Sequence, residues 1–425
     1  MSSSKLQKEI ENLSKQARSA SYKLATLSLE QRNKVLAEIA LLLDKNHSQI
    51  LEENKKDIEA AKKNRLSAAF TDRLTLTDKY IDSMIDGVKQ IIDLDDPLNR
   101  ILEERTLKNG LLLKKVSVPL GVILMIFESR PNVTIDAASL CLKSGNAVIL
   151  RGGSDALYSN KILAGIITSA LEKLRIHKNS VQLVTNPDKE AVNLLLEQEK
   201  YIDVVIPRGG YGLIKAIAEH SKIPVIKHYQ GICHTYVDDE ADLKLAEEVC
   251  FNAKCSRPAV CNAMECLVVN EKIADKFLPS MIRRYISAGV KIFGDEKTLA
   301  IAEKHSLEIE RAKQDHYDTE FLDLIIAVKV VDSLQEAIDF INTHSTKHSE
   351  AIISKNQKSI KQFMDSIDAS AVFANTSTRF NDGFEFGLGA EIGISTDKLH
   401  ARGPVALKEL TTYKYLVFGN GQIRA

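Results

Sequence analysis

The sequence has no excess of charge of either sign. Its 57 Lys and Arg residues balance 57 Asp and Glu residues, so the formal net charge is +0. A chain without a basic field has little to hold a nucleic acid or an anionic membrane surface. The expected partners are a small molecule and further copies of the same chain, so we predict a homo-oligomer, either a dimer or a tetramer.

A membrane-spanning run and an export signal are also missing. The most apolar stretch, residues 111–127, is interrupted by two lysines, a proline and a glycine. It therefore falls short of the roughly 18–20 apolar residues that a spanning helix needs. Residues 1–16 are polar with scattered charge, unlike the apolar core and small-residue cleavage site of a signal peptide. We expect a cytoplasmic chain with no membrane partner.

Cysteine is sparse, and its spacing does not suit zinc. Six cysteines in a chain of 425 residues are expected to be free thiols in a reducing compartment. His344 and His348 have the spacing of a metal pair on a helix, but no third ligand is evident. Four of the cysteines are separated by four, five and four residues, unlike zinc ligand pairs: Cys250, Cys255, Cys261 and Cys266. We predict no metal site.

The first quarter of the chain has a helical pattern followed by a hairpin. Residues 3–93 place apolar side chains three and four positions apart, and Ser28 suits a helix start. Asn109-Gly110 then lies between two strand-like runs, which is a strong short-range signal for a β-hairpin. Because an isolated two-stranded ribbon is marginal, we expect residues 99–120 to form an arm against a partner subunit. The alternative is an arm that folds back on its own domain.

Repeated strand–helix units predict two α/β lobes, each with a doubly wound parallel sheet. In the first lobe, Gly153 and Gly209-Gly210 follow strands, at the edge where such sheets bind nucleotides. Arg151 and Arg208 end the same strands, and each guanidinium could hold a phosphate or could lie at the surface. Residues 1–98 and 121–239 are expected to form a cofactor-binding domain, and residues 99–120 the arm. Residues 240–400 are expected to form a catalytic domain, and residues 401–425 a C-terminal segment that returns to the cofactor domain or the arm's sheet.

The stretch Phe251–Asn270 holds a thiol where the backbone changes direction. Cys261 lies in a loop interrupted by Pro258, directly before a hydrophobic strand, and we predict that it is a nucleophile. Cys250 on the apolar face of a helix and Cys266 within a strand are expected to be packing residues. Cys255 remains the alternative nucleophile.

Seven blocks of the sequence carry a family likeness. They are ESRPNVT, GNAVILRGG, VIPRGG, HYQGICHTYVD, NAKCSRPAVCNA, AIDFINTHSTKHSEAI and the glycine-rich run that ends in KLHARGP. In this order they resemble the aldehyde dehydrogenase superfamily, and most closely its branch that reduces L-glutamyl 5-phosphate to glutamate 5-semialdehyde. The resemblance implies an aldehyde dehydrogenase-like α/β fold with an oligomerisation arm, and NADPH as the cofactor. It also implies a thioester intermediate on Cys261.

The resemblance also implies roles for further residues. The oxyanion donors stay open, because Glu128 and not Asn132 falls where relatives carry the oxyanion asparagine; the candidates are the backbone N–H of Cys261 and Asn132. The expected cofactor-binding residues are Arg151, Gly152, Gly153, Ser154, Pro207, Arg208, Gly209, Gly210 and Glu320. The expected substrate-binding residues are Arg130, Arg257, Arg379, His400 and Arg402, without an assignment to carboxylate or phosphate.

One departure from the superfamily is informative. Oxidising members carry a glutamate that activates water against the thioester, whereas this chain has HYQG there, with His228 at or near the glutamate position. Loss of that base suits a reductase, and His228 is either an acid–base group or a structural histidine. Lys254 and Arg257 are candidates for favouring the thiolate of Cys261. The alternative functions are reduction of another acyl phosphate or acyl thioester, and cofactor binding without catalysis.

Overall fold

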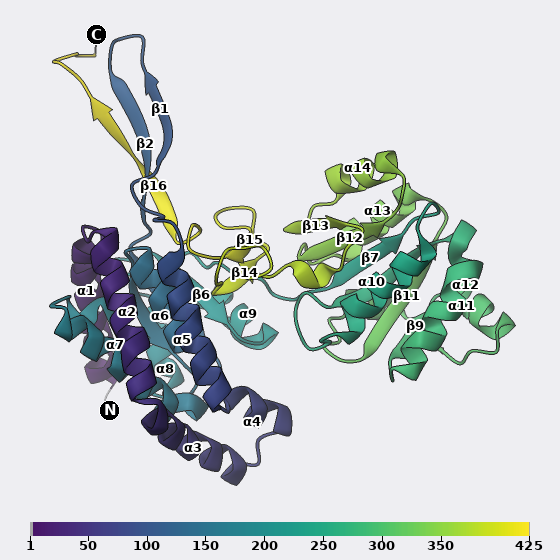
Figure 1. Cartoon of the computed structure of the whole chain (residues 1–425), viewed down its shortest axis with the longest axis horizontal. Coiled ribbons are helices and arrows are strands. Elements are labelled where there is room, and N and C mark those ends of the chain that lie inside the picture. The colour runs from purple at the N-terminus through teal and green to yellow at the C-terminus, as the bar shows by residue number, and fades with distance from the viewer. Residues whose placement is uncertain (1–2, 425) are drawn as a thin grey trace. The chain divides into compact units, whose positions relative to one another are not determined.

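The computed structural model describes residues 3–424 and divides into two compact units (Figure 1). Unit 1 contains Met1–Lys227, Gly387–Gly393 and Val405–Ala425, and unit 2 contains His228–Phe386 and Ile394–Pro404. The chain passes between the units after Lys227, Phe386, Gly393 and Pro404, and the last two crossings lie within the short strands β14 (Gly393–Ser395) and β15 (Gly403–Val405). Within residues 3–424, no helix is both long and apolar enough to cross a membrane.

The predicted N-terminal helices are confirmed. Ser28 begins α2 with a capping box: its hydroxyl accepts from Gln31 N at 3.2 Å, and its own N–H donates to the Gln31 side chain at 2.9 Å. This reciprocal pair satisfies two backbone donors that a helix start otherwise leaves free. The five helices are α1 (Ser3–Leu24), α2 (Leu29–Lys45), α3 (His47–Lys63), α4 (Ala68–Leu74) and α5 (Asp78–Asp93).

The sheet of unit 1 has the order β5-β4-β3-β6, and all its pairs are parallel, as predicted. Every residue of β3 is buried, which explains its uninterrupted apolar sequence VILMIF. The strands are β3 (Val122–Phe127), β4 (Ala147–Arg151), β5 (Val181–Leu183) and β6 (Val204–Arg208), and the helices are α6 (Val133–Lys143), α7 (Leu157–Lys173), α8 (Lys189–Leu196) and α9 (Tyr211–His220).

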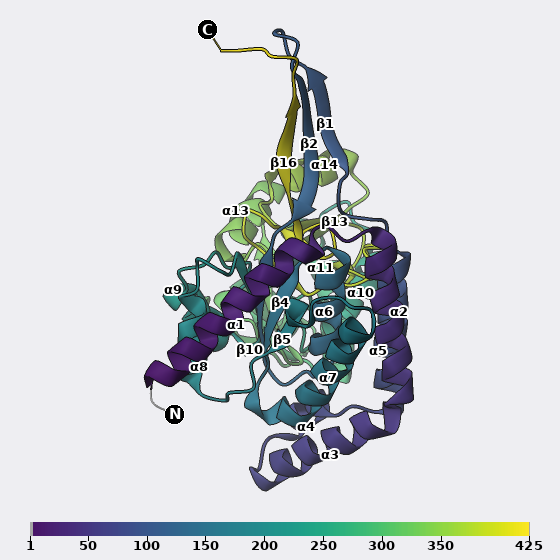
Figure 2. The same ribbon diagram turned by 90° about the vertical axis from the view of Figure 1, so that its left-hand side faces the viewer.

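The predicted hairpin is present and gains a third strand. Gly110 has φ +86° in its turn, a conformation that glycine adopts without strain. Strand β2 (Leu112–Pro119) pairs antiparallel with β1 (Ile101–Thr106) on one side and with β16 (Thr411–Phe418) on the other. Figures 1 and 2 show this three-stranded arm extending away from the helices of unit 1. The arm thus combines the hairpin with the C-terminal strand.

Unit 2 is built on a seven-stranded sheet of order β10-β9-β11-β8-β7-β12-β13, whose pairs are parallel. The predicted second α/β lobe is therefore confirmed. Its strands are β7 (Cys233–Val237), β8 (Met264–Asn270), β9 (Lys291–Gly294), β10 (Glu310–Arg311), β11 (Ile325–Val331), β12 (Ser349–Ile353) and β13 (Ala371–Ala374). Its helices are α10 (Leu243–Cys255), α11 (Glu271–Ser287), α12 (Glu296–Lys304), α13 (Leu334–His344) and α14 (Gln357–Ser366).

The division of the chain differs from the predicted domains 1–98 with 121–239, 240–400 and 401–425. Residues 228–239 lie in unit 2, because β7 is hydrogen-bonded between β8 and β12. Residues 387–393 lie in unit 1, and residues 401–404 lie in unit 2. The sequence pattern identified β7 as a strand, but the pattern of one strand does not say which sheet it joins.

Candidate active site

Cys261 lies in the loop between α10 and β8, and its side chain is half-buried. The next residue ties this loop to a short 3₁₀ helix, Thr378–Phe380. The amide of Asn262 donates to the carbonyl oxygens of Arg379 at 3.2 Å and Asn381 at 3.0 Å. The hydroxyl of Thr378 donates back to Asn262 O at 2.8 Å. These bonds hold the thiol loop from one side.

The other cysteines of unit 2 have less reactive surroundings. Cys233, Cys250 and Cys266 are buried, and burial raises the pKa of each thiol above its ordinary value. Cys255 ends α10 half-buried, and burial raises its pKa too, although Lys254 opposes the shift. The thiolate is the nucleophilic form of cysteine, so the surroundings of Cys255 disfavour it as the alternative nucleophile.

Gly231 brings a second loop against the backbone of Cys261. A Cβ at this position would lie 1.9 Å from the carbonyl oxygen of Cys261 and 2.7 Å from its Cα, so only glycine fits. The N–H of Gly231 donates to the carboxylate of Glu320 at 2.9 Å. Burial raises the pKa of Glu320. The HYQG run thus supports the thiol loop through its glycine, a role that the sequence did not indicate.

Two histidines lie beside Cys261. His228, Cys261 and His348 each offer one ligand-type atom, and these atoms lie within 4.8 Å of one another. The imidazole rings of His228 and His348 meet edge to face, with their centroids 5.5 Å apart. His348 is fully buried, and burial lowers its pKa to about 4. The sequence paired His348 with His344, but His344 instead contacts Asp318 at 2.7 Å.

The cation beside the thiol is an arginine from a distant part of the chain. The guanidinium of Arg379 bonds Asn262, and the charges of Arg379 and Cys261 interact. Lys254, predicted to favour the thiolate, is instead buried with its ammonium 2.6 Å from Glu265. Glu265 of the neighbouring strand thus pairs with Lys254, and an effect of Lys254 on the thiolate stays a prediction. Arg257 is exposed in the thiol loop, where its charge also acts on Arg379.

The remaining predicted substrate residues lie in other surroundings. Arg402 forms an ion pair of 2.8 Å with Asp368, which also holds Lys347 and Lys398. These cations keep the pKa of Asp368 well below its usual range. His400 is exposed in the same segment of unit 2, and Arg130 is exposed in unit 1. The structure therefore brings Arg379 and Arg257 to the thiol loop and leaves the roles of the other three as predictions.

In unit 1, three parallel strands end at one edge of the sheet. Arg151 pairs with Ile126 in register, and Arg208 pairs with Phe127, so the segments after β3, β4 and β6 begin at one level. Two of them start with glycine pairs, 152–153 and 209–210, and the third starts with Glu128. The N–H of Gly210 donates to the Glu128 carboxylate at 3.2 Å. This edge has the position of the predicted nucleotide site.

Its glycines and Arg151 suit a bound phosphate-containing group. A Cβ on Gly152 would lie 2.2 Å from the side-chain amide of Asn160, so there is no room for a larger residue than glycine at this position. The guanidinium of Arg151 donates to Gly152 O at 2.8 Å and Pro187 O at 3.0 Å, while its buried Nε has no partner among the described residues. Burial lowers the pKa of Arg151. The positive charge of Arg151 at this edge suits an anionic ligand.

Two other predicted cofactor residues, Pro207 and Ser154, belong to unit 1, whereas Glu320 belongs to unit 2. Pro207 is buried within β6, and Ser154 is exposed at the start of a 3₁₀ helix, Ser154–Ala156. Asn132 precedes α6 and donates through its amide to Asp136 at 2.8 Å. Burial raises the pKa of Asp136 to about 6, although Asn132 and Arg208 both favour the carboxylate.

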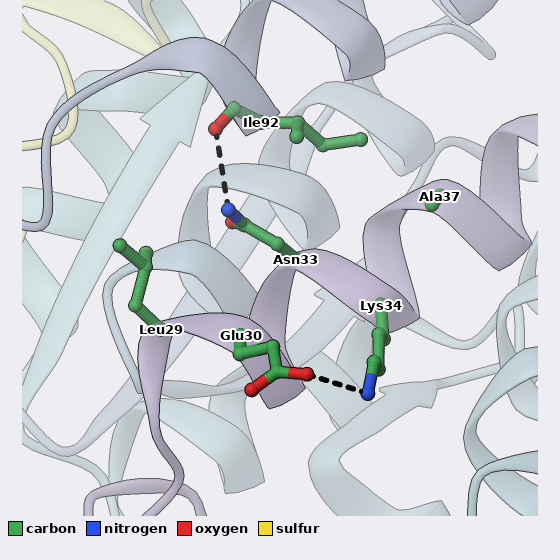
Figure 3. A pocket seen from close by; sticks show the side chains of 6 residues that line it. All are labelled: Leu29, Glu30, Asn33, Lys34, Ala37 and Ile92. Carbon is green, nitrogen blue, oxygen red and sulfur yellow. Dashed lines mark hydrogen bonds and ion pairs between the residues drawn. The ribbon is translucent and has the colours of Figure 1, made fainter.

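A surface hollow of about 480 Å³ lies elsewhere on unit 1, and Figure 3 shows the side chains that line it. Its six lining residues belong to α2 and the end of α5. The side-chain amide of Asn33 in this hollow donates to Ile92 O at 3.4 Å, and its oxygen accepts from the buried Lys143 ammonium at 2.8 Å. These contacts hold helices together, so the candidate active site is the Cys261 loop and not this hollow.

The comparisons with known proteins agree with this assignment of the fold. The model of the aldehyde dehydrogenase family matches residues 3–308. The chain therefore belongs to the aldehyde dehydrogenase family, and membership implies a nicotinamide cofactor.

Relatives within the family carry a more specific name. Gamma-glutamyl phosphate reductase of Sulfurihydrogenibium sp. is 53% identical over 97% of this chain and 94% of its own length. The crystal structure of gamma-glutamyl phosphate reductase from Thermotoga maritima has a TM-score of 0.96 at 45% identity, covering 98% of this chain and 100% of its own. An acetylating aldehyde dehydrogenase from Geobacillus thermoglucosidasius shares the fold, with a TM-score of 0.70 at 17% identity, covering 100% and 99%.

Proposed function

We propose that this chain catalyses the NADPH-dependent reduction of L-glutamyl 5-phosphate to L-glutamate 5-semialdehyde and phosphate, a step of proline synthesis from glutamate. One observation carries the proposal. The relative named gamma-glutamyl phosphate reductase is 53% identical over 97% of this chain. The half-buried thiol in the Cys261 loop supplies the nucleophile that the reaction needs.

Cys261 acts as the covalent catalyst. Its thiolate attacks the acyl carbonyl, a C–S bond forms, the bond from carbon to the phosphate oxygen breaks, and phosphate leaves with the electron pair. Bound NADPH supplies the hydride that reduces the resulting thioester. The hemithioacetal then releases the aldehyde and returns the thiolate. The backbone N–H of Cys261 and one N–H of the Asn132 amide, whose nitrogen has a second hydrogen besides the one given to Asp136, serve as oxyanion donors.

Charge and hydrogen bonding around the thiol suit this chemistry. Arg379 places a positive charge near the sulfur of Cys261 and is available to a substrate anion, and Arg257 adds a second positive charge. Nδ1 of His228 is hydrogen-bonded to the carbonyl oxygen of Ile394 at 2.7 Å, so the backbone holds this ring in place. An imidazole fixed in this way replaces the hydrolytic glutamate of oxidising enzymes, and a reductase gains nothing from activating water against its own thioester.

Unit 1 binds the cofactor, with Arg151 as the residue that favours NADPH over NADH. The proposed contacts are the glycine pairs at 152–153 and 209–210 with Ser154, Pro207 and Arg208, while Glu320 of unit 2 holds the nicotinamide ribose. A guanidinium pairs well with the extra ribose phosphate of NADPH. Arg151→Ala should therefore raise KM for NADPH more than KM for NADH. Equal effects on both would contradict this role.

The arm joins two copies of the chain in the cytoplasm. Strands β1 and β16 are the two edges of its sheet, and exposed apolar side chains lie on both. An exposed apolar edge strand is a ready surface for another copy. These side chains are Ile101, Leu102, Tyr413, Tyr415, Val417 and Phe418. Light scattering after chromatography should give a dimer or tetramer, and Val417→Lys should shift it toward a monomer.

The deciding experiment measures NADPH oxidation with freshly generated glutamyl phosphate and with a panel of other acyl phosphates and acyl thioesters. We expect glutamyl phosphate to give the highest kcat/KM and Cys261→Ala to abolish turnover while NADPH still binds. Preference for another acyl donor would change the substrate. Turnover retained in Cys261→Ala, or lost only in Cys255→Ala, would overturn the assignment of the nucleophile.

A further inference from the structure

A cluster of three metal-ligand side chains surrounds the reactive thiol. Cys261 comes from the loop before β8, His228 from the segment before β7, and His348 from the residue before β12. Their ligand-type atoms lie within 4.8 Å of one another, and all three residues belong to unit 2. One thiolate with two imidazoles is a donor set that Zn²⁺ prefers.

The two imidazoles are already oriented in the way that metal-binding histidines are. Nδ1 of His228 lies 2.7 Å from the carbonyl oxygen of Ile394, and Nδ1 of His348 lies 2.8 Å from the hydroxyl of Ser349. A hydrogen bond at one ring nitrogen fixes the ring and leaves the other nitrogen to bind a metal. For each histidine the remaining nitrogen is Nε2.

The Nε2 atom of His348 gives independent support. His348 has an exposed fraction of 0%, yet its Nε2 has no hydrogen-bond partner among the described residues. A buried polar atom without a partner is costly and calls for an explanation. A ligand bound at this nitrogen would remove that cost, so the atom points to a site and not only to a packed histidine.

We propose that Cys261, His228 and His348 form a three-ligand site for a zinc-like divalent cation, with water at the fourth position. Zn–N and Zn–S bonds of tetrahedral sites place neighbouring ligand atoms about 3.4–3.6 Å apart. The observed separations, up to 4.8 Å, need only small side-chain movements to reach this geometry. The charges of Glu320 and Glu350 act on His348 and favour a cation, whereas Arg379 beside Cys261 opposes it.

Occupancy of the site would inhibit the enzyme reversibly. The ion replaces the proton of the Cys261 thiol, and that proton is released to solvent. The same sulfur cannot then attack an acyl phosphate, so the cation and the acyl group compete for it. This consequence rests on the proposed role of Cys261 as the nucleophile, whereas the binding of the ion does not.

The test titrates the metal-free full-length chain with ZnCl₂ by calorimetry and with CoCl₂ by absorption. We expect one ion per chain, a thiolate-to-cobalt charge-transfer band, and loss of that band in Cys261→Ser. His348→Gln and the partly exposed His228→Gln should each weaken zinc binding by at least about tenfold. His344→Gln and Cys255→Ser are the matched controls and should leave the affinity unchanged. Circular dichroism of each variant checks that it is folded.

Binding that survives His228→Gln and His348→Gln, or that the two controls weaken equally, would overturn the site. Inhibition is measured separately, as loss of NADPH oxidation on adding Zn²⁺ and its recovery with a chelator. If zinc binds as described but Cys261→Ser keeps its turnover, the proposed function fails and the metal site stands. If turnover needs Cys261 but no ion binds, the metal site fails and the function stands.

Discussion

Replacing Gly231 by alanine should disable Cys261 without changing any side chain of the thiol loop. The new Cβ would lie 1.9 Å from the carbonyl oxygen of Cys261, 2.6 Å from its carbonyl carbon and 2.7 Å from its Cα. Contacts of a Cβ below 3.0 Å are essentially never observed, so one of the two backbones has to move by the difference of about 1.1 Å. The obstacle is backbone and not a flexible side chain, which makes the movement unavoidable.

A displacement of this size reaches the reacting sulfur. Misplacing a catalytic group by about 1 Å can cost about 100-fold in rate, or about 2.7 kcal/mol of transition-state stabilisation. The N–H of residue 231 would move as well, which weakens its hydrogen bond to Glu320. We therefore expect kcat of Gly231→Ala to fall by about 100-fold.

The assay is NADPH oxidation at saturating substrate, with NADPH binding measured in parallel by fluorescence. The affinity for NADPH should fall much less than kcat, because Gly231 adjoins only the proposed contact at Glu320, and the other proposed cofactor contacts belong to unit 1. Gly165→Ala in α7 is the matched control, since a Cβ there meets nothing within 4 Å. A Gly231→Ala enzyme with kcat within about threefold of the wild type would refute the reasoning.

Three further predictions concern charged groups. Glu265→Leu leaves the Lys254 ammonium buried without this partner and should lower the free energy of unfolding, measured by urea denaturation, by about 3–5 kcal/mol. The double variant Lys254→Met/Glu265→Leu removes both charges and should recover most of the lost stability. Arg379→Ala removes the cation beside Cys261 and should slow its alkylation at pH 7, with Arg311→Ala as a control that leaves the rate unchanged. Burial raises the pKa of Asp136 to about 6, so the folded chain holds this proton more tightly than the unfolded chain does. The free energy of unfolding should therefore fall by about 1–3 kcal/mol as pH rises from about 4 to 6. Asp136→Asn should remove that slope, and an unchanged slope would contradict the assignment.

Local signals in the sequence predicted local structure well. Ser28 with Gln31 forms the capping box that starts α2, and Asn109-Gly110 forms the turn of the arm. Both features depend on residues a few positions apart, so their physics is readable from the chain itself. The alternation of apolar strands and amphipathic helices likewise predicted both parallel sheets.

What the sequence could not predict depends on contacts between distant segments. The closeness of Lys254 to Cys261 in the sequence did not indicate that Lys254 pairs with Glu265 on the next strand. Arg379 and His348 reach the Cys261 loop from positions about a hundred residues away, and no spacing rule links them. Nor does the sequence say that the backbone of Gly231 lies against that of Cys261, because a single glycine usually marks a turn.

The central claim, that Cys261 carries the acyl group, is tested most directly by mass spectrometry. The protein is mixed with glutamyl phosphate in the absence of NADPH, quenched in acid and digested. We expect a glutamyl adduct on the peptide that contains Cys261, its loss on adding NADPH, and no adduct in Cys261→Ala. An adduct on Cys255, or full turnover with no adduct on Cys261, would contradict the role of Cys261 as the acyl carrier.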